Sequence, residues 1–300
     1  MSKSVGNVIA PEDILKKYGA DILRIWVASS NYAEDLRIDY SILDQHADSY
    51  RKIRNTFRYL LGNINDDFEE IDLEKTDVKS LPELEQFMLH KIYSLDLNFK
   101  KYFKNYDFHN LYKELLIFCT VDLSAFYFDI RKDCLYCDSK ASAKRQSTIL
   151  LLKIILNALL KWFAPILSFT TEEIFKLVTN KKSIHLEKFI NFPDTFNNDE
   201  LNLKWLELIK IRNICNLSIE EKRANKLIGS SLEASLKIKL NEETFKLIKK
   251  IDVAELCITS AAIIEKTDQN EVLVETEKAK GNKCSVCWKV SLLPCERHGS

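Results

Sequence analysis

Residues 41 to 61 read SILDQHADSYRKIRNTFRYLL, and Gly62 follows them. The large apolar residues of this segment recur at helical spacing, and a glycine after the last one is typical of a helix end. They are Ile42, Ile53, Phe57, Leu60 and Leu61. The segment predicts one long helix, whose apolar face must be buried against other elements.

The same pattern recurs farther along the chain. Apolar residues repeat with helical spacing over residues 82–102, 108–129, 142–163 and 170–178. We therefore expect a bundle of about five helices between residue 41 and roughly residue 180. In the last run, Thr170 and Glu173 have the spacing of a capping box, which favours a helix start at Thr170.

The most apolar stretch, residues 149–169, is interrupted by Lys153, Asn157, Lys161 and Pro165. Charged side chains are costly inside a bilayer, and a membrane-spanning helix needs a longer uninterrupted apolar run. A buried amphipathic helix explains the stretch better. We expect neither a transmembrane segment nor a membrane partner.

Shorter elements flank the predicted bundle. Two short helices separated by Gly19 precede it, and a helix over residues 203–225 follows it. Beyond that helix, residues 235–240 and 271–275 alternate apolar and polar side chains like strands, with residues 242–251 as a helix between them. The fold class we expect is mainly α, with a small α+β unit after the bundle.

Composition limits the classes of protein that fit. The 300 residues are 46% hydrophobic, and 44 Lys and Arg balance 44 Asp and Glu. No overall positive field indicates a nucleic-acid partner, so any RNA contact must come from local patches. Eight cysteines occur without a leader segment at the start, which is typical of a reducing, cytoplasmic setting.

The sharpest chemical pattern lies near the C-terminus and has the spacing Cys284-x2-Cys287-x7-Cys295-x2-His298. Each close pair can chelate a metal from one tight turn. Four such ligands close a tetrahedral structural zinc site with no open position for catalysis. Free thiols on a frayed terminal segment are the alternative, but small terminal segments rarely fold unaided. We predict one structural Zn2+ ion.

Basic and aromatic residues surround this pattern. Between residues 278 and 300, five Lys or Arg residues oppose one acid, Glu296, so the segment stays positive with zinc on three thiolates. An exposed ring at Trp288 could stack on an unpaired base, and a buried ring could equally cover the small core of the site. Cys134-x2-Cys137 has no partner pair nearby and fits structural cysteines.

Arg51, Arg54 and Arg58 lie at i, i+3 and i+7 of the first long helix and share one face. Such a face could follow the phosphates of an RNA. On composition alone, a solvated charged face is the simpler explanation. Arg212, with Lys222 and Arg223 farther along its helix, poses the same question with less force.

The chain opens with Met1-Ser-Lys-Ser-Val-Gly-Asn, a polar loop that can place an ammonium group and hydroxyl donors on a triphosphate. Together with the residues after it, this loop resembles the Lys-Met-Ser-Lys-Ser signature of class I aminoacyl-tRNA synthetases, from its second residue on. Pro11-Glu-Asp-Ile-Leu, Tyr18-Gly-Ala-Asp-Ile-Leu-Arg-Ile-Trp-Val-Ala-Ser and Ala47-Asp-Ser-Tyr-Arg-Lys-Ile-Arg-Asn are similar to bacterial-type isoleucyl-tRNA synthetase.

Further matches extend the resemblance over essentially the whole chain. They include Trp162-Phe-Ala-Pro-Ile-Leu-Ser-Phe-Thr, Ser183-Ile-His-Leu, Gly229-Ser-Ser-Leu-Glu-Ala and the terminal Cys-x2-Cys-Trp. Their order and spacing together make the assignment specific. A valyl or leucyl relative would require better agreement between residues 21 and 61.

The resemblance implies an enzyme that joins isoleucine to isoleucine tRNA with ATP and Mg2+. It implies that Lys3 contacts the ATP phosphates and that Ser2 and Ser4 shape the loop. We expect a cytoplasmic monomer with no DNA partner.

The resemblance also implies how the tRNA is held. The helical domain grips the anticodon stem and loop, and the C-terminal zinc module assists anticodon recognition. This makes Arg51, Arg54, Arg58 and Trp288 candidates for RNA contact.

On this basis the chain divides into four parts. Residues 1–40 hold the signature loop and a remnant of the catalytic domain, and residues 41–200 form the helix-bundle anticodon-binding domain. Residues 201–277 form a helix with the small α+β unit, and residues 278–300 form a zinc knuckle.

Two departures from the family matter. The family usually ends in a second Cys-x2-Cys, whereas here His298 follows Cys295 and can replace a thiolate at zinc. The nucleotide-binding core, the amino-acid pocket and the editing insertion are absent upstream. We therefore expect a truncated gene, an incomplete sequence or a misassigned start, and a chain that binds tRNA without forming an adenylate.

Two alternatives remain open from the sequence alone. One is a stand-alone, non-catalytic zinc and RNA-binding protein derived from a synthetase tail. The other is a helical scaffold with a zinc staple and no RNA role, which would show no preference among tRNAs.

Overall fold

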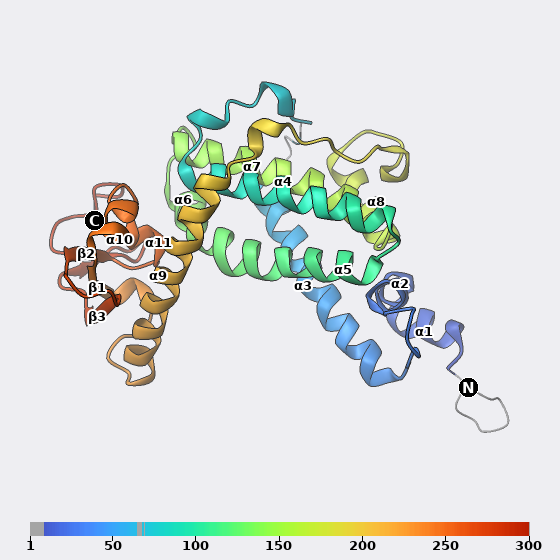
Figure 1. Ribbon diagram of the computed structural model, residues 1–300, viewed down its shortest axis with the longest axis horizontal. Helices are drawn as coiled ribbons and strands as arrows, with labels where there is room; N and C mark the ends of the chain where they lie inside the picture. The colour runs from blue at the N-terminus through green and yellow to red at the C-terminus, as the bar shows by residue number, and fades with distance from the viewer. Residues whose placement is uncertain (1–8, 65–67, 69, 300) are drawn as a thin grey trace. The chain divides into compact units, whose positions relative to one another are not determined.

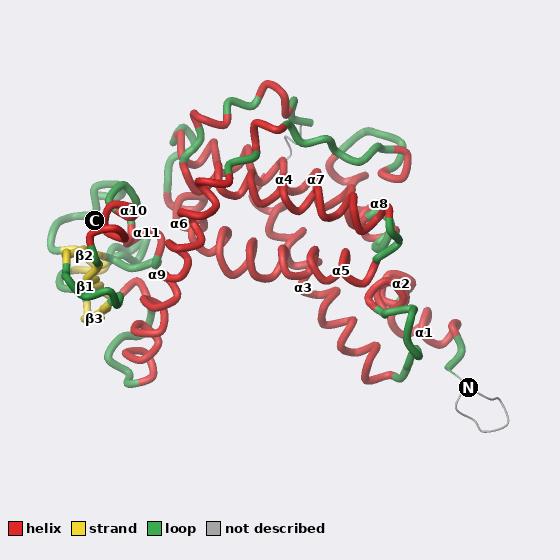
Figure 2. The backbone as a smooth tube through the Cα atoms, viewed as in Figure 1, coloured by secondary structure: helices red, strands yellow, loops and turns green. Residues whose placement is uncertain are grey.

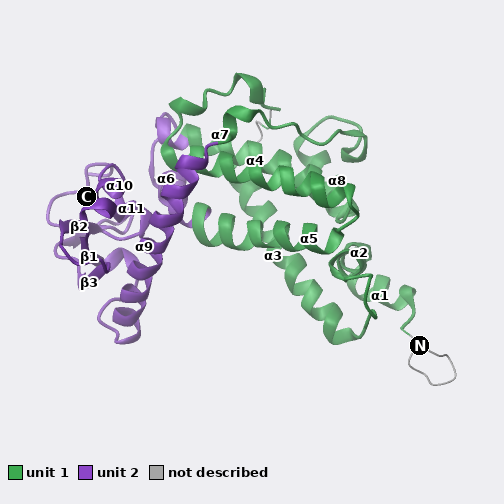
Figure 3. Ribbon diagram, viewed as in Figure 1, with its two compact units in different colours: residues 1–127, 146–197 green, residues 128–145, 198–300 purple. Residues whose placement is uncertain are grey.

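The structure is a computed structural model that describes residues 9–64, 68 and 70–299. Helices dominate it, and two small sheets lie in its C-terminal part (Figure 1, Figure 2). The chain divides into two compact units (Figure 3). Unit 1 holds residues 1–127 and 146–197, and unit 2 holds residues 128–145 and 198–300.

Unit 1 is a helical bundle. Its helices are α1 (Pro11–Tyr18), α2 (Ala20–Ser29), α3 (Tyr40–Ile64), α4 (Glu83–Lys104), α5 (Phe108–Ile117), most of α7 (Ala143–Phe163) and α8 (Ser168–Val178). Short 3-10 turns are η2 (Leu73–Lys75), η3 (Val78–Ser80), η5 (Ile184–Leu186) and η6 (Asp194–Phe196). These bounds confirm the bundle and the long helix expected from residues 41–61.

The run expected as one α-helix over residues 108–129 differs in its second half. Helix α5 passes without a break into a π-helical segment, Phe118–Phe128, and then into α6 (Asp129–Cys137). Within the wider turns, the Ser124 hydroxyl donates to the carbonyl of Cys119, five residues earlier, at 2.8 Å. Apolar spacing alone does not distinguish this wider turn from an α-helix.

Aromatic rings from four helical segments meet in the core of unit 1. Trp162 of α7 is fully buried, and its ring centroid lies 6.0 Å from that of Phe99 in α4. The centroid of Phe118, in the π-helical segment, lies 6.3 Å from Trp162. Phe57 of α3 lies edge-on to Phe163 of α7 at 6.2 Å. The apolar faces predicted from sequence therefore pack on one another.

Helix α7 contains the stretch that raised the question of a membrane span. It is long and apolar enough to cross a membrane, and 67% of its most apolar window is buried. The indole Nε1 of Trp162 donates to buried Asp96 at 3.0 Å, which satisfies both polar groups in the core. The structure agrees with the interpretation of a buried core helix.

The start of α8 corrects the capping-box prediction. The helix begins at Ser168, two residues before Thr170, and its N-cap side chain accepts no hydrogen bond. The carboxylate of Asp21, in α2, caps the start of α8 instead. It accepts from the amides of Phe169 (3.3 Å) and Thr170 (2.8 Å) and from the Thr170 hydroxyl (2.6 Å). A buried carboxylate from another helix thus replaces the local cap.

Unit 2 combines helices with a three-stranded sheet. After α6 its elements are α9 (Asp199–Ala224), η7 (Ser231–Glu233), β1 (Ala234–Leu240), α10 (Glu242–Ile248), α11 (Val253–Leu256), β2 (Ala261–Lys266), β3 (Leu273–Lys278), β4 (Asn282–Lys283) and β5 (Val290–Ser291). The strand order is β2-β1-β3, with β1 parallel to β2 and antiparallel to β3. The predicted small α+β unit is confirmed.

The sequence predicts β1 but not β2, because the two strands differ in their apolar pattern. Along β1, Ala234, Leu236, Ile238 and Leu240 are buried and alternate with half-buried residues, which is the pattern of a strand with one covered face. The β2 sequence, AAIIEK, lacks this alternation. Its pairing with β1 is set by tertiary context.

Candidate zinc site and RNA-contact surfaces

Two tight turns at the end of unit 2 bring the four predicted ligands together. Strands β4 and β5 pair, and the loop between them carries Cys284 and Cys287. The amide of Trp288 donates to the carbonyl of Cys284 at 3.0 Å, which closes the first turn. The amide of His298 donates to the carbonyl of Cys295 at 3.1 Å, which closes the second.

The ligand atoms form a compact set. One ligand atom from each of Cys284, Cys287, Cys295 and His298 lies within 4.8 Å of all the others. The Sγ atoms of Cys287 and Cys295 are 3.8 Å apart, and His298 Nδ1 lies 3.5 Å from Cys284 Sγ and 3.3 Å from Cys295 Sγ. Zn–S bonds of about 2.3 Å and a Zn–N bond of about 2.0 Å imply tetrahedral edges of roughly 3.5 to 3.8 Å. The cluster could therefore bind zinc.

The second ring nitrogen of His298 is held by α6. Nε2 lies 3.1 Å from the backbone carbonyl oxygen of Cys137. Because a carbonyl only accepts hydrogen bonds, this contact places the proton on Nε2 and leaves the lone pair of Nδ1 facing the thiols. Cys134 and Cys137 are not part of this four-residue cluster, and their interpretation as structural cysteines stays a prediction.

Arg297 joins the second turn to the end of α6. Its Nη1 lies 2.9 Å from Asp133 and 2.8 Å from Asp138, and its Nη2 lies 3.1 Å from the other oxygen of Asp133. Burial alone would raise the pKa of Asp133, but hydrogen bonds from Arg297 and the charges of Lys289 and Arg297 lower it. Arg297, one of the five cations of the predicted positive segment, is therefore committed to an internal ion pair.

Gly281 is a structural requirement that the sequence did not reveal. Its φ is +122°, and a Cβ at this position would lie 2.1 Å from the carbonyl oxygen of Ser291. Only glycine allows β5 to approach this closely. An isolated glycine before the first cysteine was the only available signal for it.

Trp288 presents its ring to solvent. The side chain is 59% exposed, and Lys283 Nζ lies 5.7 Å from the ring centroid. The ring is therefore not buried in the core of the zinc site. Trp288 also has a φ of +64°, a left-handed conformation that is unfavourable for a bulky side chain. A bulky residue where glycine would fit better suggests a role for the ring itself.

The three arginines of α3 lie on the exposed face of that helix. Arg51, Arg54 and Arg58 are all exposed, whereas the opposite face, which includes Ile53 and Phe57, is buried in unit 1. Arg51 pairs with Asp48 one turn earlier. In the part of the chain that the structure describes, no carboxylate lies within ion-pair distance of Arg54 or Arg58.

Other predicted candidates are placed differently. Arg212, whose role the sequence left open, is buried, and its Nε donates to the carbonyl of Leu256 at 2.9 Å. Arg223 pairs with Glu220 on the same helix at 2.6 Å. The loop residues Ser2, Lys3 and Ser4 lie outside the described residues.

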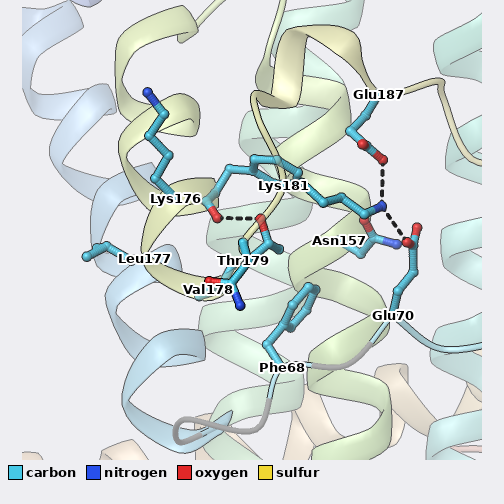
Figure 4. A pocket seen from close by; sticks show the side chains of 11 residues that line it. Phe68, Glu70, Asn157, Lys176, Leu177, Val178, Thr179, Lys181 and Glu187 are labelled. Atoms are coloured by element: carbon cyan, nitrogen blue, oxygen red, sulfur yellow. Dashed lines mark hydrogen bonds and ion pairs between the residues drawn. The ribbon is translucent and has the colours of Figure 1, made fainter.

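A pocket of about 410 Å³ in unit 1 matches none of the predicted sites (Figure 4). Lys181 Nζ donates to Glu70 at 2.7 Å and to Glu187 at 2.9 Å. The hydrogen bond from Lys181 lowers the pKa of Glu70. Because the ammonium group is neutralised by two carboxylates, the pocket does not offer this cation to a phosphate.

Comparison with protein families defines the class of this chain. Residues 85–239 match the model described as the anticodon-binding domain of tRNA ligase, and residues 1–39 match that of class I tRNA synthetases of the I, L, M and V group. The first match covers more than half of the chain, which therefore belongs to the family of tRNA-ligase anticodon-binding domains.

Within that class, the chain is similar over nearly its whole length to isoleucine–tRNA ligases. It is 70% identical over 299 residues to the one from Pelagibacter ubique, covering 99% of this chain and 33% of that protein. It is 39% identical to the one from Agrobacterium fabrum, covering 97% of this chain and 31% of that protein. The chain spans about a third of the length of these relatives. These matches confirm the resemblance identified from the motifs.

Proposed function

We propose that this chain is the tRNA-binding portion of an isoleucine–tRNA ligase. Similarity to isoleucine–tRNA ligases over 99% of the chain carries the proposal, together with the anticodon-binding match over residues 85–239. The parent reaction is the ATP-dependent ligation of isoleucine to isoleucine tRNA. In that reaction Lys3 contacts the phosphates of ATP bound with Mg2+, and Ser2 and Ser4 shape the loop that carries it.

Unit 1 supplies the surface for the tRNA backbone. The exposed face of α3 carries Arg51, Arg54 and Arg58, and two of these have no carboxylate partner among the described residues. Guanidinium groups on one helix face can neutralise successive phosphates and release their counterions. The overall neutral charge does not oppose this, because the contact is local.

The zinc knuckle supplies a stacking ring. Cys284, Cys287, Cys295 and His298 would hold zinc with four protein ligands and no open position, so the role of the metal would be structural. Bound zinc would fix the two turns, the first of which holds Trp288 in its exposed, left-handed conformation. An exposed indole stacks on an unpaired base, such as those of an anticodon loop.

The test is the affinity of the zinc-loaded chain for isoleucine tRNA and for a non-cognate tRNA, measured across a salt series. Phosphate contacts weaken steeply with salt, whereas base contacts preserve a preference between sequences. We expect a cognate preference that persists at high salt. Equal and salt-labile binding would favour a generic RNA-binding protein, and no binding would favour a scaffold.

The 300 residues by themselves are expected to bind tRNA without forming isoleucyl-adenylate, because a single lysine loop does not build a nucleotide pocket. Accumulation of isoleucyl-adenylate by the purified chain would contradict this expectation. A cytoplasmic location and a monomeric state stay predictions.

A further inference from the structure

His298 poses a problem of orientation that a cysteine would not. A thiolate ligates through its one sulfur, whereas an imidazole has two nitrogens and a ring plane, and only one nitrogen can face the metal. Ligating histidines are therefore usually held by a partner on the other nitrogen. Here that partner is the carbonyl of Cys137, 3.1 Å from Nε2.

The residue before His298 makes a second, stronger attachment to the same helix end. Arg297 holds Asp133, in the middle of α6, with both Nη atoms, and Asp138, just beyond α6, with Nη1. The side chains of Arg297, Asp133 and Asp138 are 32%, 23% and 16% exposed. A partly shielded, two-pronged arginine–carboxylate contact fixes direction as well as distance.

We propose that Arg297, Asp133 and Asp138 are positioning residues of the metal site, which aim His298 Nδ1 at the three thiolates by tying the 295–298 turn to the end of α6. This inference rests on the proposed zinc binding. It makes α6, which contributes no ligand, part of the zinc site. It also assigns Arg297 to the metal site and not to RNA contact, because its guanidinium group already makes three hydrogen bonds to the carboxylates of Asp133 and Asp138.

The first experiment uses Arg297→Gln in the full chain. The apo protein is titrated with zinc against a competing chelator, and the cobalt-substituted protein is examined by absorption spectroscopy. We expect zinc affinity to fall about 10- to 100-fold, the size of effect typical of outer-shell residues. The cobalt spectrum should keep its thiolate charge-transfer bands and change its ligand-field bands, because the imidazole is lost before the thiolates.

Two further variants complete this experiment. Asp133→Ala with Asp138→Ala removes the other side of the contact and should give the same loss, with no further loss when combined with Arg297→Gln. Arg223→Gln removes a comparable ion pair with Glu220, on the surface of α9, and should leave zinc affinity unchanged. Circular dichroism checks that each variant retains its helices.

Arg297 could act by orienting the histidine or by stabilising the turn in general. The same substitution in a His298→Cys chain distinguishes these two effects. In His298→Cys, a thiolate replaces the imidazole, so Arg297→Gln should weaken zinc binding much less than in the parent. An equal loss in both backgrounds would contradict the orienting role, and no loss in either would contradict the inference altogether. A parent chain that binds no zinc would instead overturn the proposed zinc binding.

Discussion

The bundle of unit 1 has a core of large apolar side chains, whereas the described residues of the knuckle, 278–299, expose most of theirs. In the bundle, Trp162 and Phe57 are at most 1% exposed. In the knuckle, Trp288, Leu292 and Leu293 are 59%, 78% and 75% exposed. About twenty residues cannot bury enough apolar surface to fold alone. The bundle is therefore held by burial, whereas the knuckle depends on the ion pairs of Arg297 and, as proposed, on zinc.

Removal of zinc should have the largest effect, because it should unfold the knuckle and leave the bundle folded. A structural zinc site of this kind contributes roughly 10 kcal/mol or more of apparent folding free energy to the residues around it. After chelation, amides of residues 282–299 should lose their protection from hydrogen exchange, while the helical circular dichroism signal is retained. Loss of the helical signal together with the knuckle would contradict the comparison.

A substitution in the bundle should have the next largest effect. Trp162→Ala removes a fully buried ring that packs on Phe99 and Phe118, so it should lower the free energy of unfolding by about 3 to 5 kcal/mol. Chemical denaturation measures this. A loss below about 1 kcal/mol would mean that the ring is not part of a close-packed core.

Loss of the cap on α8 should lower the free energy of unfolding by less than Trp162→Ala does. Asp21→Ala removes three hydrogen bonds at the start of that helix and should cost about 1 to 2 kcal/mol. Thr170→Val removes the hydroxyl contacts with Asp21 and with Tyr50, keeps the backbone bond and serves as the milder control. A loss in Asp21→Ala no larger than that in Thr170→Val would contradict capping of the backbone amides by Asp21.

Trp288→Gly should have the smallest effect on stability, but it should weaken tRNA binding. Glycine relieves the left-handed strain of about 1 to 2 kcal/mol, offset in part by its greater freedom in the unfolded chain. Zinc affinity should stay the same or rise slightly, while affinity for isoleucine tRNA falls. A Trp288→Gly chain that binds tRNA as tightly as the parent would remove the ring from the proposed interface.

Local features of the molecule could be predicted from sequence. The helices follow from apolar spacing, β1 from its alternation, and the cluster of three cysteines and one histidine from the spacing of two close pairs. These signals are local, because neighbours on a helix face or in a tight turn are near in sequence.

Features that depend on distant contacts were missed. Asp21 reaches α8 across 148 residues, and Arg297 reaches Asp133 across 164. The sequence left the role of Arg212 open for the same reason, because its partners come from elements that only the fold brings near. The π-helical turns differ from an α-helix by too little to alter the apolar pattern.

In the proposed function, the exposed face of α3 binds tRNA phosphates. The most direct test of this binding compares the salt dependence of tRNA affinity in the parent and in Arg51→Gln/Arg54→Gln/Arg58→Gln. A control, Lys75→Gln/Lys79→Gln/Lys101→Gln, removes three exposed cations from elsewhere in unit 1. The slope of log affinity against log salt is negative. We predict that its magnitude decreases by about 2 to 3 in the arginine variant and stays unchanged in the control. An unchanged slope in the arginine variant would contradict phosphate binding by this face.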